Sequence, residues 1–197
     1  MKITSEYITY LQKELQGVLN EQRYLHTLGV AYVSASLAMA HGIDHREALV
    51  AGLLHDCAKH YSGTELQEKC REVGLSVSQY EMQLTQLLHA AYGAYLAKTR
   101  YRIEKEEILL AIRYHTVGRP GMTPLEQIVF LADYLEPERT QRTEPELDEI
   151  RRIAFTNLDE ATFLVLKNTL QYLESTGQEM APETKETYQY YFDRRVT

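Results

Sequence analysis

The sequence predicts an all-α, single-domain helical bundle that spans residues 1–197. Apolar residues recur at helical spacing along nearly the whole chain. Alternating strand-like runs bounded by glycine or asparagine–glycine turns are absent from the sequence. No repeat, low-complexity segment or linker-like boundary divides the chain, and its length is sufficient to bury one sizeable core. From ordinary loop lengths we expect about nine helices.

Start and stop signals divide the N-terminal half of the chain into helices. Side chains of Ser, Thr, Asp and Asn accept hydrogen bonds from the unpaired N–H groups of a first turn, and glycine closes a helix in the left-handed region. The expected helices, with the residues that begin or end them, are 5–15, 20–41 (Asn20, Gly42), 44–59 (Asp44 with Glu47), 64–73 (Thr64, Gly74) and 78–96 (Ser78).

The C-terminal half contains the clearest start signal. A threonine is followed directly by a proline at the first helical position and by a glutamate at the third, ahead of an apolar helix. The expected helices here are 104–114, 123–136 (Thr123, Pro124 and Glu126, stopped by Pro137), 143–175 (Thr143, Gly177) and one from Pro182. The tyrosines of the last helix, Tyr188, Tyr190 and Tyr191, are expected to pack in the core.

The composition excludes several classes of protein. With a net charge of -7, the chain lacks the basic face that charge-driven nucleic-acid binding requires. No run is long and apolar enough for a membrane span, and the N-terminus lacks the apolar core of a signal peptide. The two cysteines, Cys57 and Cys70, form neither a disulfide framework nor a metal-type spacing. We therefore expect a cytoplasmic protein that binds neither nucleic acid nor membrane.

One short stretch carries the strongest chemical signal. Small and apolar residues from Ala51 onward run directly into His55 and Asp56. Burying an imidazole beside a carboxylate costs several kcal/mol unless a partner compensates. The partner is either the other member of the pair, in a structural hydrogen bond, or a metal ion. For an isolated pair the structural hydrogen bond is the better interpretation.

Further histidines and aspartates reverse that balance in favour of a metal. The chain has only seven histidines, and four of them, with two aspartates, lie at apolar or helix-end positions. These six side chains are expected to converge on one pocket: His26, His55, Asp56, His89, His115 and Asp133. The other three histidines, at turn-like positions, are expected on the surface without a role: His41, His45 and His60.

A mixed set of imidazole and carboxylate ligands suits iron, manganese, cobalt or zinc and does not select among them. Such a metal lowers the pKa of a bound water from about 15.7 toward about 7, and the resulting hydroxide can attack phosphorus. Lys59, one turn after the His-Asp pair, is well placed for a phosphate oxygen. His89 and His115 remain open as cationic hydrogen-bond donors, as the general acid, or as ligands of a second metal.

The order of these residues resembles the HD superfamily of metal-dependent phosphohydrolases. Within it, the chain is most similar to the YqeK branch, the bacterial symmetrical diadenosine tetraphosphate hydrolases. The segments that carry the resemblance are Ala51-Gly52-Leu53-Leu54-His55-Asp56 with Lys59, the loop His115-Thr116 with Gly118-Arg119-Pro120-Gly121-Met122, and Ala132-Asp133-Tyr134-Leu135-Glu136-Pro137 with Arg139.

The resemblance implies a role for each matching residue. The expected metal, iron, would be held by His26, His55, Asp56 and Asp133. The phosphates would face Lys59, His89, His115, Thr116 and Arg139. The segment that contains Gln178 and Pro182 would lie near the base and ribose. Two positions depart from the family pattern, Ala181 where His is frequent and Gln189 where Asn is frequent.

Taken together, the residues and the resemblance predict a hydrolase that splits diadenosine tetraphosphate into two ADP. Asp56, Lys59, His89 and His115 are the expected catalytic residues, and a small nucleotide is the expected partner, with a homodimer allowed. Two alternatives stay open: a phosphatase of nucleoside mono- or diphosphates or guanosine alarmones, and a non-catalytic nucleotide-sensing protein. Arg119 either orders its loop or contacts substrate, and Arg139 either contacts phosphate or pairs on the surface.

Overall fold

The computed structural model describes residues 3–137 and 144–195, with the backbone alone for residues 144–146. Helices are the only regular elements in these residues, which confirms the predicted all-α class. In chain order they are α1 (Ser5–Val18), α2 (Glu21–Ala40), α3 (His45–Leu54), α4 (Gly63–Glu72), α5 (Gln79–Gln83), the 3₁₀ helix η1 (Thr85–Leu87), α6 (Leu88–Thr99), α7 (Glu106–Tyr114), α8 (Pro124–Leu135), α9 (Glu144–Ala154), α10 (Leu158–Thr176) and α11 (Pro182–Arg194).

The described residues contain more helices than the nine expected, because two expected helices are interrupted. The 78–96 segment breaks at Leu84, whose backbone leaves the helical region (φ -89°, ψ 73°). The 143–175 tract breaks at Asn157, which is extended and whose side chain caps α10 by accepting from the Glu160 N–H. Thr143, the predicted cap of that tract, lies outside the described residues.

The predicted end of the third helix near Lys59 is wrong. Helix α3 stops at Leu54, and the chain continues in tight turns whose N–H groups bond carbonyls three residues back. His55 is therefore the C-cap of α3, and Asp56 lies in the turn that follows. This turn allows two adjacent side chains to face the same region, whereas adjacent residues within a helix diverge by about 100°.

Most of the predicted caps are present. Asn20 accepts from the Arg23 N–H, and Thr123 forms a full capping box with Glu126 at the start of α8. Gly42 adopts the left-handed conformation (φ +69°) that the predicted stop after α2 requires. The cap of α4 is Ser62 and not the predicted Thr64.

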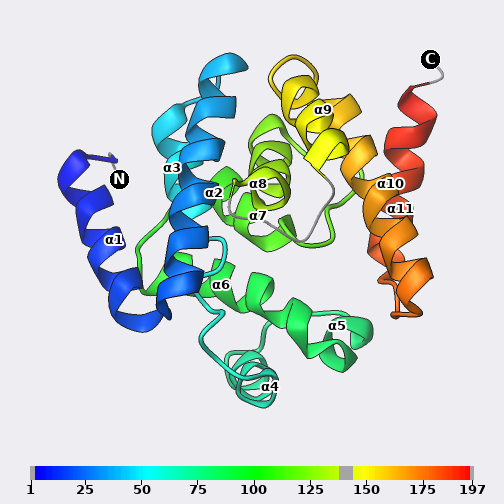
Figure 1. Ribbon diagram of the computed structural model, residues 1–197. Helices are drawn as coiled ribbons and strands as arrows, with labels where there is room; N and C mark the ends of the chain where they lie inside the picture. Colours follow the sequence, from blue (N-terminus) through cyan, green and yellow to red (C-terminus); the bar gives the residue numbers. More distant parts are fainter. Residues whose placement is uncertain (1–2, 138–143, 196–197) are drawn as a thin grey trace.

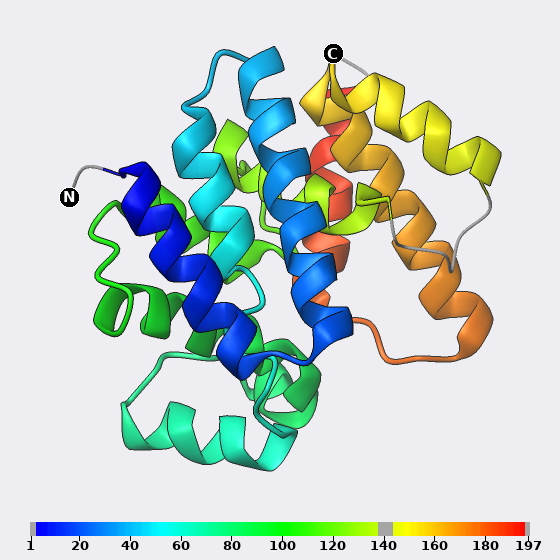
Figure 2. The same cartoon turned by 60° about the vertical axis from the view of Figure 1, so that its left-hand side comes forward.

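Helix α8 lies at the centre of the bundle (Figure 1), and nearly all of its residues are buried. Helices α2 and α7 pack against it, and α10 covers it from the side on which α11 lies. Helices α4 to α6 form one end of the molecule in both views (Figures 1 and 2). Tyr191 of α11 is fully buried and Tyr188 and Tyr190 pack against the core, as predicted.

Helices α2 and α3 pack against each other more extensively than any other described pair. The reason is Gly52 of α3, because a Cβ atom there would lie 2.7 Å from the Cα atom of Ala31 in α2. This close crossing lies five residues after His26 on one helix and three residues before His55 on the other. It therefore sets the spacing between two predicted ligands.

In the described residues, no helix has the length and apolar character needed to cross a membrane.

Candidate metal centre

Five helices deliver the six predicted side chains to one place. His26 comes from α2, and His55 and Asp56 come from the end of α3. His89 lies in the first turn of α6, His115 directly follows α7, and Asp133 lies in the last turn of α8. Charged and imidazole groups of all six meet within a few ångströms, although their positions span more than half of the sequence.

Asp56 lies at the centre of this cluster and is almost fully buried. Its Oδ2 atom is 3.5 Å from Nε2 of His55 and 3.9 Å from Nε2 of His26. Asp133 completes this side, with its Oδ1 atom 3.1 Å from Nε2 of His26 and 3.7 Å from Nε2 of His55. These four residues form a compact set of two imidazoles and two carboxylates.

The other carboxylate oxygen of Asp56 faces a second group. Its Oδ1 atom is 3.1 Å from Nε2 of His89 and 3.7 Å from Nε2 of His115. The two imidazole Nε2 atoms are themselves only 3.2 Å apart. Asp56 thus lies between two candidate metal triads, His26–His55–Asp56 and Asp56–His89–His115.

All four imidazole rings present Nε2 to the cluster, because their Nδ1 atoms have partners elsewhere. In three rings Nδ1 faces the main-chain carbonyl three residues earlier, at 2.7 Å for His55–Gly52, 2.6 Å for His89–Gln86 and 2.8 Å for His115–Ile112. A carbonyl only accepts, so Nδ1 carries the proton and Nε2 has a free lone pair for a metal ion.

The buried nitrogens test whether a metal fits. Nε2 of His26 and Nε2 of His55 are buried, and neither makes a hydrogen bond with the described residues. Unsatisfied buried polar atoms are costly, and native proteins seldom leave them without a reason. Two such atoms that point at the same pair of carboxylates are the donor set of a transition-metal site. The residues present therefore fit a bound metal ion.

The electrostatics of the cluster follow from its burial and its charges. Burial alone would raise the pKa of Asp56, but His55 and the imidazoles of His115 and His89 close to the carboxylate hold that pKa well below its ordinary value. Burial also lowers the pKa of His55, yet Asp56 and Asp133 outweigh it and raise that pKa above 6.5. For His89 burial dominates and lowers the pKa to about 4.

The predicted phosphate contacts are only partly brought to the cluster. Lys59 lies at the cluster, because its Nζ atom is 3.1 and 3.3 Å from the two ring nitrogens of His89. Thr116 follows His115 directly and is half-buried. Arg139 lies outside the described residues.

The two predicted base and ribose contacts lie farther along the chain. Gln178 and Pro182 are exposed, between α10 and the first turn of α11. Helix α11 reaches the loop after His115, because a Cβ on Gly118 would be 2.9 Å from the Thr187 methyl group. Gln189, one of the two positions that depart from the family pattern, is exposed, and its side chain donates to Asp193, 2.7 Å away.

The sequence leaves two roles open for Arg119, ordering its loop or contacting substrate. Its Nε and Nη2 atoms bond the two carboxylate oxygens of buried Glu126 at 2.6 and 2.8 Å. This bidentate pair ties the loop to the start of α8, so Arg119 orders the loop. His41, expected to have no role, has its Nε2 atom 2.7 Å from the carbonyl of Ala154 and links α2 to the end of α9.

Two contacts to the cluster were not predicted. Arg23 bonds Asp56, with 2.8 Å between Nη1 and Oδ2, and Glu136 bonds His26, with 3.0 Å between Oε1 and Nδ1. A signal for each was present in the sequence. Arg23 precedes His26 by one helical turn, and Glu136 follows Asp133 by three residues.

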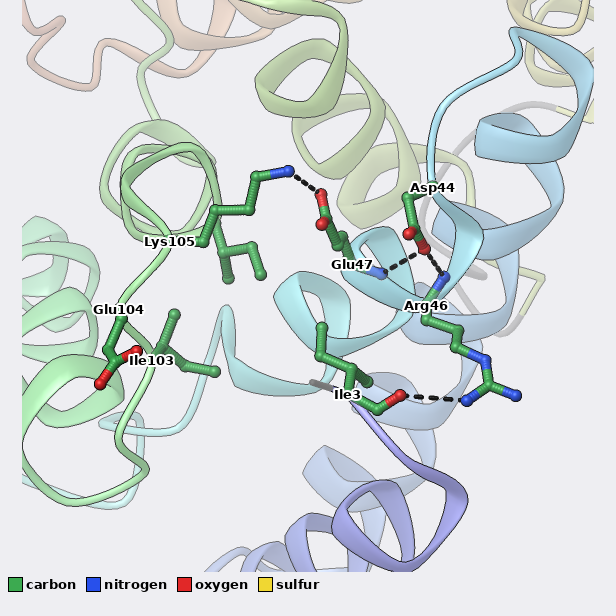
Figure 3. Close-up of a pocket in the computed structure, with 8 residues that line it drawn as sticks. Ile3, Asp44, Arg46, Glu47, Ile103, Glu104 and Lys105 are labelled. Carbon is green, nitrogen blue, oxygen red and sulfur yellow. Dashed lines mark hydrogen bonds and ion pairs between the residues drawn. The ribbon is translucent and has the colours of Figure 1, made fainter. Parts of the chain in front are cut away.

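A separate hollow of about 420 Å³ lies at the opposite end of α3 (Figure 3). Most of its charged groups have partners in the hollow, since Lys105 bonds Glu47 and Arg46 donates to the carbonyl of Ile3. Asp44 caps α3 there by accepting from two main-chain N–H groups. At a rise of about 1.5 Å per residue, the length of α3 separates this hollow from His55.

Comparison with known proteins gives this geometry a family. The model of the HD domain matches residues 23–138, which contain all six clustered residues. The chain belongs to the HD domain family. The chain is also similar to proteins named symmetrical bis(5'-nucleosyl)-tetraphosphatase. It is 39% identical over 170 residues to the one from Bacillus subtilis (strain 168), and the match covers 86% of this chain and 89% of that protein.

Two further comparisons agree. The corresponding protein of Halalkalibacterium halodurans is 40% identical over 172 residues, with 86% of this chain and 89% of that protein covered. A crystal structure of a predicted HD superfamily hydrolase involved in NAD metabolism from Clostridium acetobutylicum matches this chain with a TM-score of 0.89. It is 34% identical, and the match covers 98% of this chain and 100% of that one. The predicted family resemblance is thereby confirmed.

Proposed function

We propose that this chain is a metal-dependent hydrolase that splits diadenosine tetraphosphate symmetrically into two ADP. The observation that carries the proposal is the single buried carboxylate of Asp56 between two groups of imidazoles. Its relatives at 39% and 40% identity are named for this activity. Symmetrical cleavage requires attack on one of the two central phosphorus atoms, and the other central phosphate then leaves as part of ADP.

The residues proposed to hold the metal are His26, His55, Asp56 and Asp133. Two imidazole nitrogens and two carboxylates favour a transition metal over an all-oxygen magnesium site, and iron is the metal we propose. When bound, the ion supplies chemistry that the side chains lack, because it lowers the pKa of a coordinated water to about 7. Arg23 stays outside this set and donates to Asp56, so it fixes the orientation of the carboxylate.

The chain's own cations and donors act on the phosphates. Lys59 brings its ammonium group to the His89 side of the cluster, where negative charge on phosphate oxygens grows during the reaction. Thr116 follows His115 and is half-buried, and its hydroxyl is proposed as a further donor to the phosphates. Gln178 and Pro182 are proposed to line the nucleoside end, and Arg139 is proposed to contact a phosphate.

Of the three roles left open for His89 and His115, their geometry favours one. Together with Asp56 Oδ1 they form a second triad of potential ligands. We propose that this triad would hold a second metal ion, with Asp56 contributing an oxygen atom to each site. Two bound ions would supply charge stabilisation to both the attacking and the leaving oxygens of an in-line displacement.

The second-metal proposal predicts the metal content of a variant. In His89→Ala, elemental analysis is expected to show about one metal ion per chain, against about two in the unchanged protein. Lys98→Ala, a change on the same helix, is the matched control and should retain both ions. If the unchanged protein holds a single ion at saturation, His89 and His115 act on the substrate alone.

The products test the proposed reaction directly. With iron, manganese or cobalt supplied, chromatography is expected to show two ADP formed for each diadenosine tetraphosphate consumed. ATP with AMP would show asymmetric cleavage and contradict the proposal. A panel of nucleoside mono- and diphosphates and guanosine alarmones at equal concentration is the control. Faster turnover of any of these would favour the phosphatase alternative.

Dimer formation and a cytoplasmic location stay predictions. The solvent-exposed face of α2 carries Leu25, Tyr32 and Met39, which are each more than half exposed and spaced by seven residues. A stripe of this kind is suited to a partner helix. Both cysteines are buried and unpaired, in keeping with the reducing compartment expected from the sequence.

A further inference from the structure

One imidazole of the cluster is held differently from the other three. His55 and His115 each directly follow a helix, and His89 lies in the first turn of α6 after η1. The carbonyls that their Nδ1 atoms face lie in the last turns of α3 and α7 and in η1. Carbonyls in a last turn have no partner within the helix, so they are free to accept from a side chain.

His26 has no such carbonyl, because it lies inside α2, which continues to Ala40. The carbonyl three residues earlier, of Arg23, lies within the regular hydrogen-bond pattern of that helix. The Nδ1 atom of His26 instead faces Oε1 of Glu136, at 3.0 Å. Glu136 is the C-cap of α8 and is 1% exposed, so its carboxylate is buried against the ring.

We propose that Glu136 is the positioning residue of His26, and that the lack of a side chain at Gly29 leaves room for the Glu136 carboxylate. Accepting from Nδ1–H, the carboxylate holds the proton on the outer nitrogen and turns Nε2 toward Asp56 and Asp133. A carboxylate behind a metal-ligating histidine also makes the ring a stronger donor to the metal. This inference rests on the proposed metal site.

Gly29 is the second, independent observation. It lies three residues after His26 on α2, where a Cβ atom would be 2.9 Å from Oε2 of Glu136 and 3.5 Å from its Cβ. The clash would fall on the end of a side chain and not on backbone, so the helix need not move. Alanine at this position would push the carboxylate away from His26 while it improves the helix itself.

The test measures Co²⁺ binding, and the d–d absorption bands of the loaded protein, in the full chain. Glu136→Gln and Glu136→Ala are expected to weaken Co²⁺ binding about 10- to 100-fold in competition with a chelating dye. Both are expected to shift the absorption bands. Gly29→Ala is expected to weaken binding as well, without lowering the melting temperature of the metal-free protein.

The matched control is Glu126→Gln, since Glu126 is also 1% exposed and lies at the other end of the same helix. It should lower the melting temperature through loss of the Arg119 pair and leave both Co²⁺ affinity and spectrum unchanged. Long-range nitrogen–proton NMR of the metal-free protein should find the ring proton of His26 on Nδ1. A ring proton found on Nε2 would overturn the proposal.

The two levels of proposal fail in different ways. If the unchanged protein binds no Co²⁺, the proposed metal site is wrong and the role of Glu136 falls with it. If the unchanged protein binds Co²⁺ and Asp56→Asn does not, the metal site stands. The role of Glu136 alone would then be overturned if three variants bind Co²⁺ with unchanged affinity and spectrum: Glu136→Gln, Glu136→Ala and Gly29→Ala.

Discussion

Replacing Asp56 by asparagine is expected to abolish metal binding and to lower kcat/KM for diadenosine tetraphosphate by at least about 10³-fold, or roughly 4 kcal/mol of transition-state stabilisation. The carboxylate of Asp56 is within 4 Å of an Nε2 atom of all four clustered histidines. Asparagine keeps its shape but has no charge and only one oxygen. Metal content by elemental analysis and steady-state kinetics measure the two losses.

The control for this variant is Asp148→Asn, which removes an exposed carboxylate that pairs with Arg151 on α9. Surface pairs of this kind contribute between about 0 and 1 kcal/mol, so metal content and activity should not change. Circular dichroism should show the helices intact in both variants. Normal turnover by a folded Asp56→Asn protein would remove the metal cluster from the mechanism and favour the nucleotide-sensing alternative.

Replacing Gly52 by alanine is expected both to destabilise the fold and to move the metal ligands apart. The added Cβ would lie 2.7 Å from the Cα atom of Ala31 and 3.0 Å from Oγ of Ser34. Backbone cannot yield as a flexible side chain can, so α2 and α3 must move apart. Overpacking of this kind costs about 1–3 kcal/mol. The melting temperature should fall by about 2–4 °C for each kcal/mol, and metal affinity should fall with it.

Gly17→Ala supplies the comparison, because a Cβ there meets nothing within 4 Å and the residue lies in α1, away from the cluster. Alanine should stabilise this helix by about 0.5–1 kcal/mol without any change in metal binding. A Gly52→Ala protein as stable as the original would show that the crossing of α2 and α3 can relax.

Local sequence determined most of the helices and the residue types of the cluster. Asn20 and Thr123 predicted two helix starts, and Gly42 a helix stop, because capping and left-handed turns depend on neighbouring residues only. His55 and Asp56 stood out for the same reason, as polar groups set into an apolar run. Family resemblance then supplied the expectation of which residues act together.

Tertiary structure alone decided how these groups meet. The end of α3 at Leu54 turns His55 and Asp56 to one side, and the Gly52–Ala31 crossing sets the separation of His26 from them. Glu136 as the partner of His26, Arg23 as the partner of Asp56 and Glu126 as the partner of Arg119 also emerged only from packing. The physical reason is that a buried charge takes whatever partner lies across the helix interface. The spacing of Glu136 from Asp133 places it near a predicted ligand, but nothing in the sequence pairs it with His26, which is 110 positions away.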